Sequence, residues 1–543
     1  MQKTGRSPLV ADWNTLDRVF IRPEDERCRK TLVKYMEQIL FGLHDFLNRH
    51  VGVTEEISLV RLAEEYTDTL INKDPQKKLA DVIKDIINEI APRAVNVASP
   101  YFIGHMTSAI PFFMVHLKTI TAALNQNVIK LETSKVLSIL EKQVLAKIHR
   151  MIYRFDESFY AQHVQNVDTS LGAFTTGGTT ANLTALWVAR NKSFPPKKDF
   201  KSIETNGIVH AFRAHNLERG VVLVSRRGHF SLKKAGGILG LGSNNIIPMA
   251  LDSNGTIDLA CLKDKIARLR SDPGTRIIAV VGIAGATETG KIDPLPELAQ
   301  ICETNGIHFH VDAAWGGPVL LSETYRHLLE GIERADSVTI DCHKQFYMPM
   351  TSGMVYFKDP RAMDNIVYHA SYVNRPGSVD LGIKTLEGSR EANSLILDSA
   401  LKIMGSRGYG LMIDHGIETA AEFAEMIKKR RFFQLVTSPC LNILTYRLVP
   451  PDIQQKLEAA GEKEKIKLEA IVDEINIRLQ RIQRENGKSF VSRTKLPVNA
   501  DTSRESVVLR CVIMNPMTTP EILNEILDEQ EMIFNTKIKA GIG

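Results

Sequence analysis

The sequence is poor in cysteine and lacks the patterns that cysteine-dependent structures need. Its 543 residues include six cysteines, spread from residue 28 to residue 511, and no two of them form a C-x-x-C pair. This spacing argues against a disulfide framework or a zinc site and is typical of a reducing compartment. We therefore expect a cytoplasmic protein that holds no metal.

Long hydrophobic runs and clustered charge of one sign are also missing. No run of 18 or more apolar residues occurs, which argues against a membrane span, and the first 20 residues contain no apolar stretch typical of a secretory signal. The net charge is only +5, with 24% charged residues, and no Lys/Arg cluster has interleaved aromatics. A nucleic-acid partner is therefore not indicated, and the length favours two or three globular domains.

Two kinds of periodicity divide the chain. Residues 1–95, and again about 128–153, carry apolar residues at helical spacing. After about residue 170, short β-branched runs alternate with amphipathic stretches; the runs are 220–225, 276–285, 306–312, 336–341 and 353–357. Strands that are apolar throughout, with helices between them, predict an α/β fold with a mostly parallel sheet covered on both faces.

The C-terminal part has a different pattern. A long helical stretch at 464–486 lies between strand-like runs at 441–448 and 505–514, which predicts a small α+β domain. Most of 365–390 is expected to form a loop. We expect three parts, which are a helical N-terminal segment (1–115), a large α/β domain (116–400) and a small α+β domain (401–543).

Two charged side chains follow successive strand-like runs. Asp312 ends the run "HFHVD", and Lys344 follows the next run in "DCHK". In a parallel sheet both would emerge at the edge where ligands of such sheets bind. A lone lysine after a strand is usually a solvated loop charge. A lysine that converges with a buried carboxylate, next to His343, is less ordinary.

Two further segments offer polar groups near strand ends. The Gly-rich turn in "FTTGGTTANLTALWVAR" precedes a helical pattern, so its amides and the hydroxyls of Thr179 and Thr180 suit a phosphate, although such turns also cap ordinary helices. It matches neither the P-loop nor the dinucleotide fingerprint. His229 follows the run at 220–225. A histidine at this position can be a structural residue, or its flat ring can stack on an aromatic cofactor.

One cofactor needs all four of these groups, and it is pyridoxal 5′-phosphate. A lysine forms its Schiff base, and a carboxylate keeps its pyridine nitrogen protonated so that the ring accepts electrons. A helix N-terminus takes the phosphate, and a flat ring stacks on the pyridine. The sequence therefore predicts a pyridoxal-phosphate site built on Lys344 and Asp312.

Five segments together carry a family resemblance. They are "TTGGTTANLTAL", "HFSLKKA", "GATETGKIDPL", "HVDAAWGG" and "DCHK", and from about residue 90 onward the sequence resembles the pyridoxal-dependent group II amino-acid decarboxylases. Residues 124–141 and 507–519 look most like glutamate decarboxylases, whereas the length and overall pattern are similar to bacterial pyridoxal-type aspartate 1-decarboxylases. An aminotransferase or a carbon–carbon lyase would use the same lysine and aspartate, so those activities stay open.

The resemblance implies a fold, a reaction and an assembly. The fold is that of the pyridoxal-dependent transferases (aspartate aminotransferase fold type I), and the functional unit is a homodimer in which residues 1–115 take part. The substrate is an acidic L-amino acid, which we expect to be aspartate, giving β-alanine and CO2. The alternative is glutamate, giving 4-aminobutyrate, or the substrate of another group II decarboxylase.

The resemblance also assigns roles to particular residues. Lys344 would be the Schiff-base lysine, Asp312 the partner of the pyridine nitrogen, and Arg510 the partner of a substrate carboxylate. Buried arginines pair with carboxylates in this way, although an edge-strand surface charge is the alternative for Arg510. The remaining cofactor contacts implied are His229 and Ala314 on the two faces of the ring, Gly178, Thr179 and His343 at the phosphate, and Thr287 near the ring oxygen.

Several positions depart from the family pattern. Where many relatives have Gly-Thr-Thr this chain has Gly-Ala-Thr at 285–287, and the Asn-Gln pair of glutamate decarboxylases is replaced by Ile103-Gly104 followed by His105. His105 is a candidate for the second carboxylate of the substrate, which favours the shorter aspartate, unless it merely caps the "SPYF" turn. The mobile-loop tyrosine of the family aligns with Val379, and Tyr372 is the nearest tyrosine, so the proton donor to Cα is left open.

Overall fold

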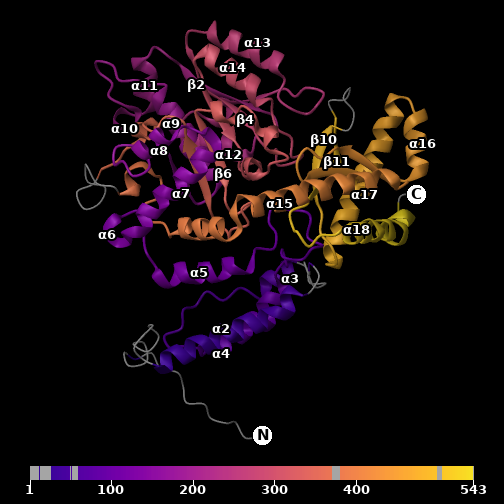
Figure 1. The fold of residues 1–543 in the computed structure, drawn as a ribbon. Coiled ribbons are helices and arrows are strands. Elements are labelled where there is room, and N and C mark those ends of the chain that lie inside the picture. Colours follow the sequence, from indigo (N-terminus) through magenta and orange to yellow (C-terminus); the bar gives the residue numbers. More distant parts are fainter. Residues whose placement is uncertain are drawn as a thin grey trace.

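Two β-sheets organise the described part of the chain. The structure is a computed structural model that describes residues 12, 26–48, 51, 59–369, 380–497 and 504–541. The larger sheet lies in the middle of Figure 1, and the smaller, C-terminal sheet lies beside it. Helix α15 (Asn393–Lys429) packs against elements next to both sheets and so connects the two parts.

The larger sheet has seven strands in the order β1-β7-β6-β5-β4-β2-β3. The four pairings among β6, β5, β4, β2 and β3 are parallel, and β7 runs antiparallel to both of its neighbours. Its strands are β1 (Gly172–Thr175), β2 (Arg219–Ser225), β3 (Ile246–Met249), β4 (Thr275–Ile283), β5 (His308–Asp312), β6 (Ser337–Asp341) and β7 (Gly353–Phe357). The predicted α/β class with a mostly parallel sheet is confirmed.

Helices cover both faces of this sheet because its strands are apolar on both sides. In β2, Val221 and Leu223 pack into one core and Val222 and Val224 into the other. The first core is closed by α7 (Val136–Tyr153), α13 (Leu259–Arg270), α14 (Leu295–Asn305) and the first half of α15. The second is closed by α9 (Gly178–Lys192), α10 (Ile203–Asn206), α11 (Ile208–Ala214) and α12 (Phe230–Ile238).

The N-terminal helices extend away from this body (Figure 1). The helices that extend are α2 (Glu26–Leu47), α3 (Leu59–Glu64) and α4 (Leu79–Asp85). Further along the chain come α5 (Phe112–Leu124), α6 (Leu131–Ser134), α7, which packs against the large sheet, and α8 (Glu157–His163). The helix predicted for 128–153 is divided between α6 and α7, because Lys135 adopts a positive φ of 38°. Among the helices of the described residues, none combines the length and hydrophobicity that crossing a bilayer requires.

The C-terminal sheet is antiparallel, in the order β10-β11-β9-β8. Its strands are β8 (Phe433–Thr437), β9 (Ile443–Leu448), β10 (Ser492–Pro497) and β11 (Glu505–Val512), and its helices are α16 (Pro451–Ala459), α17 (Glu462–Asn486) and α18 (Pro520–Ile533). A distant segment joins it, because the Ile103 amide donates to Phe490 O (3.0 Å) and the Val512 amide donates to Ile103 O (2.7 Å). The segment around Ile103 therefore joins a sheet built from residues more than 300 positions later in the chain (433 − 103 = 330).

The small α+β part is confirmed, but four strands were not predicted. They are β1, β3, β8 and β10, which are short or carry a proline or several polar residues. The boundaries at 115/116 and 400/401 stay a prediction. Of the loop expected within 365–390, residues 370–379 lie outside the described residues.

Candidate active site

A cavity of about 310 Å³ lies where the carboxyl ends of β4, β5 and β6 face the N-terminus of α9. Parallel sheets bind ligands at this edge. Eight of the ten predicted site residues line it, namely Gly178, Thr179, His229, Thr287, Asp312, Ala314, His343 and Lys344. The structure thus brings together residues that are up to 166 positions apart in the sequence (344 − 178).

Asp312 is held at the end of β5 by two hydrogen bonds. Its Oδ2 accepts from Asn182 Nδ2 (2.8 Å) and its Oδ1 accepts from the Ala314 amide (3.1 Å). Asn182 Oδ1 lies 3.0 Å from His310 Nε2, and the His310 ring continues to Ser337 in β6. The carboxylate is 6% exposed. A buried carboxylate that is oriented in this way can hold a positive group of a ligand in place.

Lys344 is close to a second carboxylate. Its Nζ lies 3.1 Å from Asp341 Oδ2, and the Asp341 side chain is 3% exposed. His343 Nδ1 donates to Ser352 O (2.7 Å), and its Nε2 is 3.9 Å from Asp341 Oδ2. The register of β5 and β6 pairs Asp312 with Thr339, so the two strand ends are adjacent, as the sequence predicted.

The Gly-rich turn leads from β1 into α9. The first amides of a helix have no partner within the helix, so those at the start of α9 are available to an anion. The Thr176 amide donates to Glu387 Oε1 (3.0 Å), and Thr176 Oγ1 lies 3.0 Å from Thr180 Oγ1. A Cβ on Gly178 would lie 2.8 Å from Asp341 Oδ2. The backbone therefore lies so close to this carboxylate that only glycine fits at position 178.

His229 caps α12 at the mouth of the cavity. Its Nδ1 accepts from the Ser231 amide (3.3 Å) and lies 2.8 Å from Ser231 Oγ. Burial lowers the pKa of His229, and the positive charge of Lys344 lowers it further. The negative charges of Asp312 and Asp341 raise it, but by less than burial and Lys344 together lower it. The surroundings of His229 therefore favour the neutral form of its ring.

Arg510 and His105 lie beside the cavity rather than in its lining. Arg510, in β11, is 8% exposed; its Nη1 donates to Ser492 Oγ (3.3 Å), and its Nε is buried with no hydrogen-bond partner in the described residues. Partial desolvation and then the charges of Arg510 and Lys344 lower the pKa of His105. His105 is thus electrostatically coupled to both residues, and it reaches them because Ile103 pairs with the C-terminal sheet.

Two residues of the site were missed in the sequence. Asn182 lies four positions after Gly178, on the same face of α9, and this i,i+4 spacing was the available signal. Asp341 is the last residue of its strand, which is the feature that singled out Asp312. Val379 and Tyr372 lie outside the described residues.

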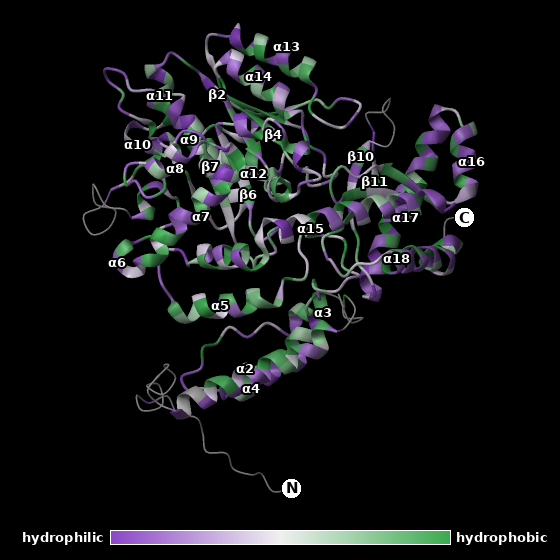
Figure 2. Ribbon diagram, in the orientation of Figure 1, coloured by the Kyte–Doolittle hydropathy of each residue, from purple (hydrophilic) through white to green (hydrophobic). Residues whose placement is uncertain are grey.

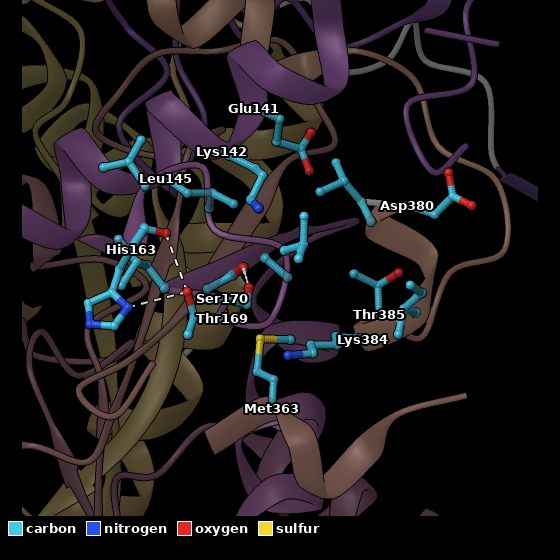
Figure 3. A pocket seen from close by; sticks show the side chains of 17 residues that line it. Glu141, Lys142, Leu145, His163, Thr169, Ser170, Met363, Asp380, Lys384 and Thr385 are labelled. Carbon is cyan, nitrogen blue, oxygen red and sulfur yellow. Dashed lines mark hydrogen bonds between the residues drawn. The ribbon is translucent and has the colours of Figure 1, made fainter. Parts of the chain in front are cut away.

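A second cavity, of about 60 Å³, lies elsewhere, between α7, β1 and residues 380–385 (Figure 3). Its two lysines are engaged, because Lys142 Nζ donates to Asn166 O (2.6 Å) and Lys384 Nζ donates to Asp168 O (3.0 Å). None of the predicted site residues lines it. No group of three or more His, Cys, Asp or Glu suited to a metal occurs within the described ranges.

A lysine and a carboxylate at adjacent ends of a covered, mostly parallel sheet, facing a glycine-rich helix start, define a pyridoxal 5′-phosphate-dependent enzyme. The chain belongs to the pyridoxal-dependent decarboxylases, since the family described as "Pyridoxal-dependent decarboxylase conserved domain" matches residues 64–449. The predicted family, enzyme class and cofactor are therefore confirmed. The free amides of α9, the lysine and the oriented carboxylate fit this cofactor.

Relatives support this family, and a solved structure supports the fold. The chain is 44% identical to an aspartate 1-decarboxylase of Aliivibrio fischeri, over 98% of this chain and 96% of the relative. It is 28% identical to an L-2,4-diaminobutyrate decarboxylase of Acinetobacter baumannii, over 69% and 71%. The fold is similar to that of the glutamate decarboxylase domain of a diaminobutyrate-pyruvate transaminase and L-2,4-diaminobutyrate decarboxylase from Vibrio parahaemolyticus, with a TM-score of 0.79, 23% identity, and coverage of 96% of this chain and 99% of that one.

Proposed function

We propose that this decarboxylase acts on L-aspartate and releases β-alanine and CO2. The observation that carries the proposal is that His105 lies within electrostatic reach of both Arg510 and Lys344, since an acidic substrate brings a second carboxylate that needs a partner. The 44% identical relative from Aliivibrio fischeri, named an aspartate 1-decarboxylase, supports the same substrate. The widely spaced cysteines favour a cytoplasmic location.

In this proposal each of the ten predicted site residues binds a part of the cofactor or the substrate. Lys344 would attach the cofactor, and Asp312 would keep its pyridine nitrogen protonated. His229 and Ala314 would flank the ring, and Thr287 would lie near the ring oxygen. Gly178, Thr179 and His343 are proposed for the phosphate, and Arg510 and His105 for the carboxylates of the substrate.

When bound, pyridoxal phosphate supplies a ring that accepts the electron pair left at Cα as CO2 departs. The protein orients the scissile bond, because Arg510 fixes one carboxylate of the substrate while the amine is held near Lys344. Asn182 and the Ala314 amide keep Asp312 fixed before the substrate arrives, so no reorganisation is needed during the reaction. A neutral His105 would donate one N–H to the second carboxylate.

The test is a comparison of substrates. Purified enzyme with added pyridoxal phosphate is assayed for CO2 release and for β-alanine or 4-aminobutyrate. We expect a kcat/KM for aspartate at least tenfold above that for glutamate, and we expect His105→Ala to narrow this gap. His210→Ala, at an exposed position of α11, is the control that should leave the ratio unchanged. A tenfold preference for glutamate or for an aromatic amino acid would refute the proposed substrate.

We also propose a homodimer, for which the exposed apolar side chains of the N-terminal helices are the support. Phe41 in α2 is 77% exposed and Phe112 in α5 is 78% exposed, and Figure 2 shows hydrophobic residues along both helices. Exposed apolar faces of this kind are commonly covered by a second copy. Light scattering should give twice the chain mass. Phe112→Asp should weaken the dimer, whereas Ile466→Asp in α17 should not.

A further inference from the structure

Asp341 is a buried carboxylate with an incomplete set of partners. Its Oδ2 lies 3.1 Å from Lys344 Nζ, but its Oδ1 is buried and has no hydrogen-bond partner among the described residues. Asp312, by contrast, has a hydrogen bond to each of its oxygens. A buried carboxylate with a partner on only one of its two oxygens lowers the stability of the folded protein, and the positive charge of Lys344 reduces this loss.

The position of Asp341 places its negative charge where a phosphate is expected. A Cβ on Gly178, the first residue of α9, would lie 2.8 Å from Oδ2, and a Cβ on Gly353 would lie 2.7 Å from Oδ1. The carboxylate therefore sits against the start of α9, close to the helix amides that favour an anion. Lys344 Nζ and His343 Nε2 lie 3.1 Å and 3.9 Å from the same Oδ2.

We propose that Asp341 is the counter-ion of Lys344 in the cofactor-free enzyme, and that its charge opposes the phosphate of the incoming cofactor at the start of α9. The Asp341 side chain thereby limits how tightly the enzyme retains pyridoxal phosphate. This inference rests on the proposed assignment of that helix start to the phosphate. Two like charges a few ångströms apart in a partly buried site repel each other, and an amide in place of the carboxylate removes this repulsion.

The inference predicts opposite contributions from the two carboxylates of the site. Asp312 faces a group that is positive when the cofactor is bound, so its charge favours binding. Asp341 would face the phosphate, so its charge disfavours binding of the cofactor. The role of this charge is to balance that of Lys344 in the cofactor-free enzyme. Loss of Asp341 should therefore strengthen binding of any phosphorylated ligand and leave a ligand without phosphate nearly unaffected.

The experiment uses the full-length apoenzyme and two ligands that cannot bond to a lysine. These are 4′-deoxypyridoxine 5′-phosphate and 4′-deoxypyridoxine, which differ only in the phosphate. We expect Asp341→Asn to lower the Kd of the phosphorylated ligand at low ionic strength by about tenfold, which is the effect of about 1.4 kcal/mol. The Kd of the unphosphorylated ligand should change by less than twofold. Asp264→Asn, at an exposed carboxylate of α13, should change neither value.

A second readout concerns the lysine itself. Without its counter-ion, Lys344 should react several-fold faster with an amine reagent in the apoenzyme at pH 8, as measured by mass spectrometry of the labelled peptide. If Asp341→Asn fails to fold, Asp341→Ser removes the same charge and is tested instead. An unchanged or higher Kd for the phosphorylated ligand in a folded variant would overturn the inference. If that Kd falls but the wild-type enzyme does not decarboxylate aspartate, the proposed substrate is wrong and this inference stands.

Discussion

At the scale of single residues, what distinguishes the site is the support behind its charged groups. Asp312 is fixed by Asn182, and Asn182 is fixed in turn by His310, so a carboxylate, an amide and an imidazole form one buried chain. Such a chain orients Asp312 only if every member keeps its partner. Two variants test the charge of Asp312 and its orientation separately.

The first variant is Asp312→Asn, which keeps the shape of the side chain and removes its charge. A neutral partner cannot hold the proton on the pyridine nitrogen, so kcat should fall by about 100-fold or more. Cofactor binding should persist, because the phosphate and the lysine attachment are untouched. The measurement is kcat at saturating cofactor, together with the cofactor content of the dialysed protein. A kcat near that of the wild type would contradict the proposed role.

The second variant is Asn182→Ala, which leaves the charge of Asp312 in place and removes what orients it. Asp312 Oδ2 and His310 Nε2 both lose a partner inside the protein, and each unsatisfied buried group costs about 1–3 kcal/mol. The urea midpoint should therefore fall along with kcat. Asn254→Ala, in an exposed turn, is the control and should change neither. A loss of stability without a loss of kcat would make Asn182 purely structural.

Most residues of the site could be predicted because their signal is local. Asp312 and Lys344 end or follow apolar runs, and Gly178 and Thr179 begin a helix after a strand. Asp341 and Asn182 were missed, since their importance lies in contacts with residues 3 and 130 positions away. Only the three-dimensional structure reveals the second of these contacts.

At the scale of elements, the start of α9 determines whether the cavity can hold an anion. Gly178 packs against Asp341 with no room for a side chain. The strands that were predicted are the long, β-branched ones in the centre of the sheet, where burial on both faces gives a clear pattern. Those missed, such as β3 with its Pro248, lie at edges, where pairing rather than composition decides the conformation.

Gly178→Ala tests this helix start. The added methyl would lie 2.8 Å from Asp341 Oδ2, so either the turn or the carboxylate must move. We expect at least tenfold weaker pyridoxal-phosphate binding and a lower Tm of the apoenzyme. The matched control is Gly237→Ala in α12, which has open space around it and should raise stability by up to about 1 kcal/mol. Equal affinities in the two variants would show that the close approach at Gly178 is unimportant.

At the scale of the whole molecule, three buried histidines make the fold sensitive to acid. Burial lowers the pKa of His149, His308 and His310 to about 4 each. His149 joins α7 to α8 through the Tyr160 hydroxyl and to β7 through Phe357 O, and the other two lie inside β5. The folded protein needs these rings neutral, whereas the unfolded chain protonates them near pH 6.5.

The sign of the pH dependence follows from these values. Because the folded pKa values lie below the unfolded ones, this stabilisation is fully present above pH 6.5 and is lost as the pH falls towards 4. Each histidine can contribute up to about 3 kcal/mol. Urea denaturation of the apoenzyme should therefore show a marked drop in stability between pH 7.5 and pH 5, and His149→Gln should reduce that drop. A pH-independent midpoint over this interval would contradict the expectation.

The pairing of Ile103 with the C-terminal sheet has a consequence for how the protein is made. Ile103 forms a backbone hydrogen bond with Val512, which the ribosome adds 409 residues later (512 − 103). At about 5–20 residues per second, Val512 is synthesised roughly 20–80 s after Ile103. Contacts between such distant positions form slowly, because a long loop must close first. His105, two residues further on, therefore reaches Arg510 only when nearly the whole chain has been synthesised. The side of the cavity that we propose for substrate recognition is therefore among the last parts of the enzyme to be assembled.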